Sequence, residues 1–129
     1  MNSSHRSRSR LAAFRHAFNG WWFVMRTQRN AWIHALATLA VILLSIWLGI
    51  PRLECAIILF AIVLVWMAEF LNTALEAVVD LASPEDNPLA KVGKDVGAAA
   101  VLIAAIGAAL IGLLVLGPPL WGRLTSVGT

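Results

Sequence analysis

The sequence predicts an all-α membrane protein with an N-terminal amphipathic surface helix and three transmembrane helices. The 129 residues are 60% hydrophobic and only 13% charged, and their mean hydropathy is +0.79. Long apolar runs recur along the chain, and basic residues gather before the first of them. A water-soluble domain of this length would need more polar surface, so we expect a bilayer to surround the apolar runs.

Basic residues characterise the N-terminal part of the chain. No aspartate or glutamate occurs before Glu54. Six arginines precede the first apolar run: Arg6, Arg8, Arg10, Arg15, Arg26 and Arg29. The positive-inside rule therefore predicts a multi-pass protein with a cytoplasmic N-terminus. We interpret the basic residues as facing anionic lipid and expect no nucleic-acid partner. The long charged stretch, with no small-residue cleavage site after the apolar run, does not fit a signal peptide.

Residues 11–28 have the pattern of a helix that lies flat in the lipid headgroup region. Large apolar residues recur on one stripe of this helix: Leu11, Phe14, Phe18, Trp21 and Met25. Polar residues, His16 and Asn19 among them, lie on the other side. This separation is typical of an interfacial amphipathic helix. We expect residues 1–9, which precede it, to be a disordered basic arm.

Three apolar runs are long enough to cross a bilayer: about 32–50, 54–81 and 93–117. A short turn at Pro51 separates the first two, and a proline-bounded acidic loop separates the last two. Pro118 and Pro119 are expected to end the third span and leave a short tail at 118–129. Within that span, small residues recur every four positions at Ala100, Ala104, Ala108 and Gly112, a spacing that favours close helix packing or self-association.

Polar residues in the second span lie on one face. At about 100° per residue, Glu69, Asn72, Glu76 and Asp80 occupy an arc of roughly 80°. An acidic stripe facing lipid would be costly, so this arc must face protein, water or cations. Residues 55–68 before it are apolar and span about 21 Å of a hydrocarbon core roughly 30 Å thick.

The two glutamates are expected at different depths in the membrane, which suggests different roles for them. Glu69 is placed near the inner-leaflet boundary, where lipid headgroups begin, and Glu76 lies about 10 Å further toward the cytoplasm. Lys94 and Asp95 start the third span at that level. Carboxylates and shared phosphates are the ligands that magnesium prefers, and a lysine neutralises phosphate oxygens, so the pattern favours phosphate chemistry. An ordinary salt bridge from Lys94 to Glu76 or Asp80 is the alternative interpretation.

His34 carries a weaker signal. No cysteine or second histidine lies near it at the spacing of metal ligands. We therefore interpret His34 as a residue that forms hydrogen bonds at the membrane interface.

Several segments resemble the bacterial diacylglycerol kinase family of small membrane kinases, which includes undecaprenol kinases. Residues 68–80, AEFLNTALEAVVD, and 90–102, AKVGKDVGAAAVL, carry the E-x-x-N-x-x-x-E element and a downstream K-D pair. FRHAFNG at 14–20 and RNAWIH at 29–34 are similar to the undecaprenol kinase branch. The resemblance covers 10–117 and implies a single lipid-kinase membrane domain. It also implies a homotrimer in the bacterial cytoplasmic membrane, with active sites shared between subunits.

Carried over by position, the resemblance implies roles for individual residues. Glu69 would be the general base for a lipid hydroxyl, and Glu76 would hold the Mg²⁺ that bridges the phosphates of ATP. Asp80 would support the site from outside the reacting groups. Further residues would contact the nucleotide: Asn72, Lys94 and Asp95, with His16 and Asn19 as candidates.

Gln28 is a departure from the family pattern. The family commonly has a metal-binding glutamate at this position of the surface helix. Gln28 offers a carbonyl oxygen without charge, and no acid occurs anywhere in the first 53 residues to replace the missing carboxylate. We therefore expect Gln28 to be a weak metal ligand.

The expected activity is ATP-dependent phosphorylation of a membrane lipid alcohol, with Mg²⁺ as cofactor. The RNAWIH segment favours undecaprenol over diacylglycerol, but the sequence leaves both open. Two further interpretations stay open as well. One is a catalytically impaired scaffold of the same fold, suggested by Gln28. The other is a small proton-coupled transporter that uses Glu69 as its carrier acid.

Overall fold

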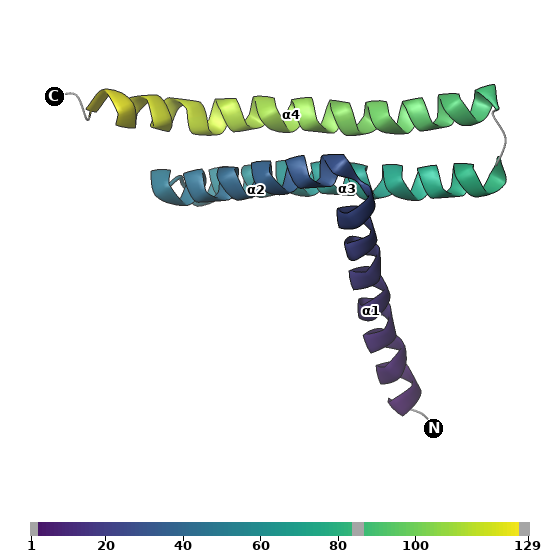
Figure 1. The fold of residues 1–129 in the computed structure, drawn as a ribbon. Coiled ribbons are helices and arrows are strands. Elements are labelled where there is room, and N and C mark those ends of the chain that lie inside the picture. The colour runs from purple at the N-terminus through teal and green to yellow at the C-terminus, as the bar shows by residue number, and fades with distance from the viewer. Residues whose placement is uncertain (1–2, 84–86, 127–129) are drawn as a thin grey trace. The chain divides into compact units, whose positions relative to one another are not determined.

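In a computed structural model of the chain, the structure describes the backbone of residues 3–83 and 87–126, and the side chains of 10–83 and 87–126. Regular structure in these ranges is helical throughout (Figure 1). The helices are α1 (Ser3–Thr27), α2 (Arg29–Leu48), α3 (Arg52–Ala82) and α4 (Pro88–Ser126). Three of them, α2, α3 and α4, are long and apolar enough to cross a membrane. The predicted all-α membrane class is confirmed.

The chain divides into two compact units, Met1–Ile33 and His34–Thr129, which are described separately. The first unit holds α1 and the start of α2. Its two helices are joined by the single residue Gln28, whose N–H donates to the carbonyl of Val24 at 2.9 Å. The N–H of Ala31 in turn donates to the carbonyl of Gln28 at 3.2 Å. Backbone hydrogen bonding therefore runs almost without a break from α1 into α2.

Helix α1 begins at Ser3, earlier than the expected residue 11, so residues 3–10 are helical as well. Its large apolar side chains are exposed in the isolated chain: Leu11, Phe14, Phe18, Trp21, Trp22 and Phe23. Exposed aromatic residues of this number suit a lipid or protein environment better than water. The location of α1 on the membrane surface stays a prediction.

Gly49 reverses the chain between α2 and α3. Its φ of 66° lies in the left-handed region, which glycine adopts without a steric penalty. Its N–H donates to the carbonyl of Ser45 at 3.0 Å, and the N–H of Ile50 reaches the same carbonyl at 3.4 Å. Pro51 follows and cannot extend α2, so α3 begins at Arg52.

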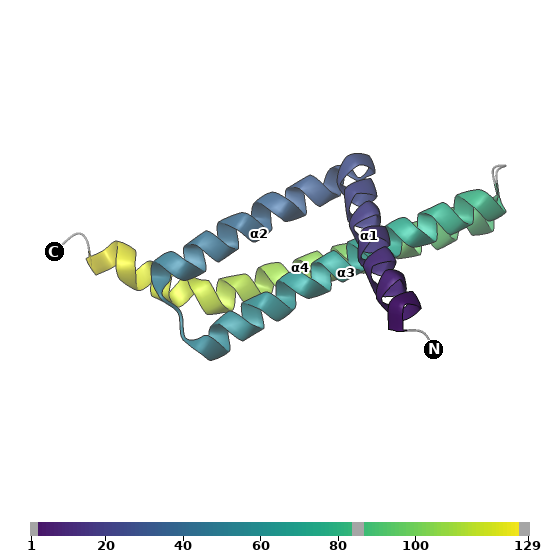
Figure 2. The same cartoon turned by 90° about the horizontal axis from the view of Figure 1, so that it is seen from below.

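Helices α3 and α4 form the most extensive packed pair and lie side by side in both views (Figures 1 and 2). Asn87 starts α4, because its side-chain Oδ1 accepts the N–H of Leu89 at 2.9 Å. Pro88 follows at the first helical position, where a missing N–H costs nothing. Residues 84–86, in the middle of the predicted acidic loop, lie outside the described residues.

A small apolar cluster joins the ends of α2 and α4 to the start of α3. Leu48, Ile58 and Leu116 are each 9% exposed or less and form its centre. Partly buried residues pack around them: Val41, Leu44, Ile50, Ile62, Ile111, Val115 and Leu120. This cluster fixes one end of the second unit by side-chain packing.

Helix α4 continues through Pro118 and Pro119 to Ser126, so the prolines do not end the helix. That the membrane span ends there stays a prediction. Gly117 precedes the pair and has no Cβ to clash with the proline ring. Leu116 and Leu120, on either side, both belong to the apolar cluster. Packing therefore holds the helix together where two backbone hydrogen bonds are lost.

Gly97 provides a close approach between α3 and α4 that lies outside the small-residue stripe expected from the sequence. Ala104 is buried, but Ala100 is exposed and Gly97 is buried instead. A Cβ atom at position 97 would overlap Oδ1 of Asn72 and would lie 3.1 Å from Cδ2 of Leu75. Glycine is thus the residue that fits between the two helices at this point.

We predict that Gly97→Ala destabilises the helix pair. The added methyl group must displace Asn72 or push α4 away from α3, and overpacking of this kind costs about 1–3 kcal/mol. The measurement is thermal unfolding of the purified protein in detergent. Gly93→Ala is the matched control, because its Cβ would meet Val79 at an ordinary 3.8 Å. Equal melting temperatures for the two variants would contradict the prediction.

Candidate active site

Glu69 lies on the buried face of α3. The buried residues of this helix are Ile58, Ala61, Val65, Glu69 and Thr73, at spacings of three and four. This spacing places them on one face of a helix. Glu69 is 2% exposed, the lowest value among these residues, although it is the only acid on this largely apolar face. A carboxyl group so placed needs a partner or a function.

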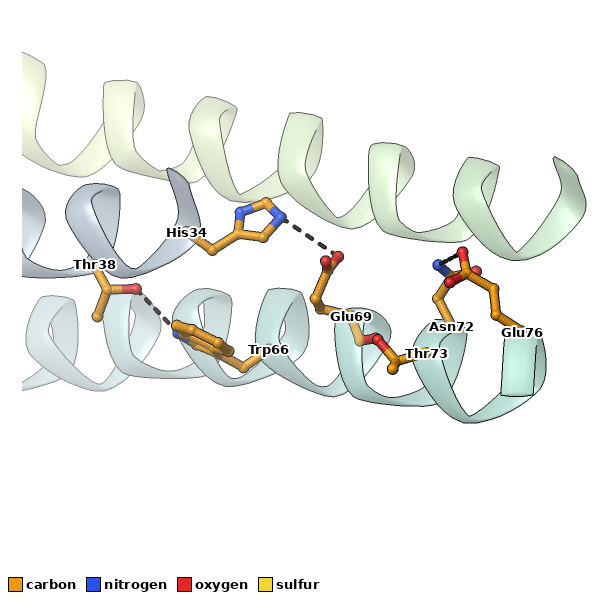
Figure 3. Close-up of polar contacts among 7 residues, drawn as sticks. All are labelled: His34, Thr38, Trp66, Glu69, Asn72, Thr73 and Glu76. Atoms are coloured by element: carbon orange, nitrogen blue, oxygen red, sulfur yellow. Dashed lines mark hydrogen bonds and ion pairs between the residues drawn. The ribbon is translucent and has the colours of Figure 1, made fainter. Parts of the chain in front are cut away.

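His34 of α2 faces Glu69. Its Nε2 lies 3.7 Å from Oε2 of Glu69, and the side chains are 15% and 2% exposed (Figure 3). Oε2 has no hydrogen bond among the described residues. Sequence reasoning missed this pairing. A signal existed, since His34 and Glu69 lie about 21 Å and about 26 Å along their helices from the α2–α3 turn.

Trp66 supports His34 from the neighbouring turn of α3. The two rings meet edge to face, with their centroids 6.4 Å apart. The indole N–H of Trp66 donates to Oγ1 of Thr38 on α2 at 3.1 Å (Figure 3). A hydrogen bond between helices in an apolar region fixes their register, and this one keeps His34 level with Glu69.

Asn72 and Glu76 form a second polar pair, one to two turns further along α3. Nδ2 of Asn72 donates to Oε1 of Glu76 at 2.9 Å (Figure 3). Oδ1 of Asn72 points toward Gly97 of α4 and has no hydrogen-bond partner among the described residues. Both side chains are half-buried, so the pair lies between the interior position of Glu69 and the exposed end of α3.

Lys94 pairs with Asp80 at the end of the α3–α4 pair. Nζ of Lys94 donates to Oδ1 of Asp80 at 2.7 Å, and the side chains are 41% and 65% exposed. The salt bridge weighed as an alternative is thus present in the free chain. An ammonium group has three donors, so Lys94 keeps two for a phosphate. Asp95 is exposed on the next position of α4.

The described residues of one chain contain no cluster of three His, Cys, Asp or Glu side chains able to hold a metal ion. Magnesium does not require one, because it is commonly held by one or two carboxylates together with substrate phosphates. Glu76, oriented by Asn72 and half-exposed, is a carboxylate of the right kind. The donor set therefore fits a nucleotide-bound magnesium and does not fit a metal held by the protein alone.

The remaining candidates belong to the first compact unit. His16 and Asn19 are exposed on α1, and Gln28 is half-buried at the residue that joins α1 to α2. The candidate site residues of the second unit are Glu69, Asn72, Glu76, Asp80, Lys94 and Asp95, to which the structure adds His34.

The sequence is similar to a known protein family and to several of its members. Residues 15–116 match the family described as prokaryotic diacylglycerol kinase. The chain is 42% identical to a diacylglycerol kinase of Synechocystis over 85% of this chain and 63% of that protein. It is 40% identical to the undecaprenol kinase of Bacillus subtilis, over 84% and 88% of the two chains. It is also 36% identical to the diacylglycerol kinase of Escherichia coli K12, over 64% and 73%. The chain belongs to the prokaryotic diacylglycerol kinase family.

Proposed function

We propose that the protein transfers the γ-phosphoryl group of ATP to the hydroxyl of a membrane lipid alcohol at the cytoplasmic face of the membrane. The observation that carries this proposal is the placement of two acids on α3. Glu69 is buried among apolar side chains, and Glu76 is half-exposed about 10 Å further along the helix. A lipid hydroxyl reaches the first position, and a nucleotide reaches the second.

Glu69 acts as the general base in this proposal. As the lipid oxygen attacks the γ-phosphorus, Glu69 takes the hydroxyl proton, and the bond from that phosphorus to the β-phosphate oxygen breaks. The products are a lipid phosphate and ADP. Phosphoryl transfer depends mainly on positioning and on neutralising charge, so few residues are sufficient.

The nucleotide is held at the exposed end of α3 and α4. Glu76 would hold the magnesium ion, and the ion would neutralise charge on the ATP phosphates. Gln28 would be a weak metal ligand, as the family resemblance of the sequence implies. Asn72 orients Glu76 through the hydrogen bond at 2.9 Å. Lys94 contacts phosphate oxygens, and Asp80 holds its ammonium group in place at 2.7 Å. Three further residues complete the nucleotide contacts: Asp95, His16 and Asn19.

The proposal includes the membrane topology and the assembly. The arginine-rich N-terminus lies in the cytoplasm, and three crossings of the bacterial inner membrane place the α3–α4 connection on the same side. The chain forms a homotrimer with sites shared between subunits. The family resemblance of the sequence implies this assembly. Undecaprenol and diacylglycerol are both candidate acceptors, as the names of the relatives suggest.

We predict that Glu69→Gln abolishes transfer of label from [γ-³²P]ATP to lipid. The amide keeps the size of the side chain but cannot accept the proton, and loss of a general base lowers the rate by about 10²–10⁴-fold. Mixed micelles containing undecaprenol and diacylglycerol provide the acceptors, and thin-layer chromatography identifies the product.

Glu54→Gln is the matched control, since Glu54 lies in the first turn of the same helix at its other end. We expect this variant to keep the natural rate. Glu69→Gln with normal activity would refute the role of Glu69. No transfer by the natural chain to either lipid would favour the scaffold, and proton flux without ATP would favour the transporter.

We predict that Gln28→Glu lowers the magnesium concentration needed for half-maximal rate. A carboxylate adds a charged ligand where the natural chain offers only a carbonyl oxygen. The measurement is a magnesium titration of the initial rate at fixed ATP. Asn30→Asp adds the same charge two residues away and should leave the requirement unchanged. An unchanged or higher requirement in Gln28→Glu would contradict the prediction.

A further inference from the structure

We propose that His34 is a positioning residue that accepts the proton from Glu69 after each transfer and so restores the base. The inference rests on the proposed function, because it concerns the fate of the proton that Glu69 takes from the lipid hydroxyl. It adds a residue of α2 to the site residues of α3 and α4.

The geometry favours this exchange. Nε2 of His34 lies 3.7 Å from Oε2 of Glu69, and that oxygen has no hydrogen bond among the described residues. Catalytic contacts of this length commonly shorten when substrate binds. Trp66 packs edge to face on the imidazole and is itself bonded to Thr38 at 3.1 Å. The ring is thereby held with Nε2 toward the carboxyl group.

Among the residues that the structure describes, two titratable groups act electrostatically on Glu69: His34 on α2 and Glu76 on α3. Glu76 is itself hydrogen-bonded to Asn72. From α4, Lys94 is bonded to Asp80 instead. Glu69 is 2% exposed and His34 is 15% exposed, so the histidine is the more open member of the pair. A proton leaving Glu69 therefore has His34 as its nearest acceptor along this route.

The proton balance is simple. Phosphoryl transfer leaves Glu69 as a neutral carboxylic acid and the lipid as its phosphate ester. Neutral His34 then takes that proton on Nε2, which gives an imidazolium beside the restored carboxylate. The imidazolium releases its proton to water, and both groups return to their starting forms. Imidazole suits this task because its free form titrates in the range of about pH 5–8.

The first test is the pH dependence of kcat in the natural chain and in His34→Gln. We expect the variant to lose at least about tenfold in kcat with the KM for ATP unchanged, because proton transfer is removed and nucleotide binding is not. The shape of the pH profile should differ between the natural chain and the variant, because Glu69 alone then handles the proton. Glutamine keeps a polar group at position 34 but does not titrate, so a natural kcat and pH profile in His34→Gln would overturn the proposal.

Ser45→Ala is the matched control on the same helix. Its hydroxyl bonds only to the carbonyl of Val41 at 2.7 Å, one turn away within α2. We expect this variant to keep the natural pH profile. If His34→Gln fails to fold, His34→Asn replaces it, and the second test needs neither variant.

The second test is ¹⁵N NMR of the histidine side chains in the natural chain and in Glu69→Gln. Replacing the carboxylate that lies 3.7 Å from Nε2 of His34 should change the ¹⁵N chemical shift of that nitrogen and leave the shifts of the exposed His16 in place. An unchanged shift for His34 would overturn the proposed coupling, whether or not the chain is a kinase. Absence of lipid phosphorylation in the natural chain, together with a changed shift, would instead refute the proposed function.

Discussion

A single carboxyl group inside an apolar helix face is the constraint on which the rest of the site depends. Glu69 lies on the same buried helix face as Ile58 and Val65. Burying a charge at such a position costs free energy, and the imidazole of His34 on α2 lies 3.7 Å from the carboxyl group. The hydrogen bond between Trp66 and Thr38 fixes the register of α2 against α3 that keeps His34 beside Glu69. Because the chain belongs to a kinase family, we propose that this buried acid serves catalysis.

The second constraint is steric and lies about one turn away from Glu69, at Asn72. Gly97 allows α4 to approach the side chain of Asn72, and Asn72 in turn holds Glu76 by its amide. Packing and chemistry are therefore linked through one residue. The ion pair between Lys94 and Asp80 adds little to stability because both groups are exposed, so its value lies in where it places the ammonium group.

Helix periodicity was enough to predict much of this from the sequence. The apolar runs gave the three long helices, and the spacing of Glu69, Asn72, Glu76 and Asp80 gave their common face. What the sequence could not supply was the contact between helices. The pairing of His34 with Glu69 leaves only a weak signal, their similar distances from the α2–α3 turn, because it depends on the depth that each helix reaches. Likewise, glycine at position 97 has no pattern that distinguishes it from the alanines that follow. The roles of the site residues in catalysis stay predictions.

Consecutive prolines inside α4 have a mechanical consequence. Neither ring nitrogen can donate to the carbonyl one turn earlier, so the backbone ladder of α4 is interrupted at Leu114 and Val115. Beyond this point the helix is attached through side chains, including Arg123, whose guanidinium lies 5.1 Å from the ring of Trp47 at the end of α2. The last turns of α4 thus keep a side-chain contact with α2 beyond the interruption. A change in bilayer thickness would bend α4 at its prolines, where backbone hydrogen bonds are missing, and the acids of α3 lie far along the chain from that point.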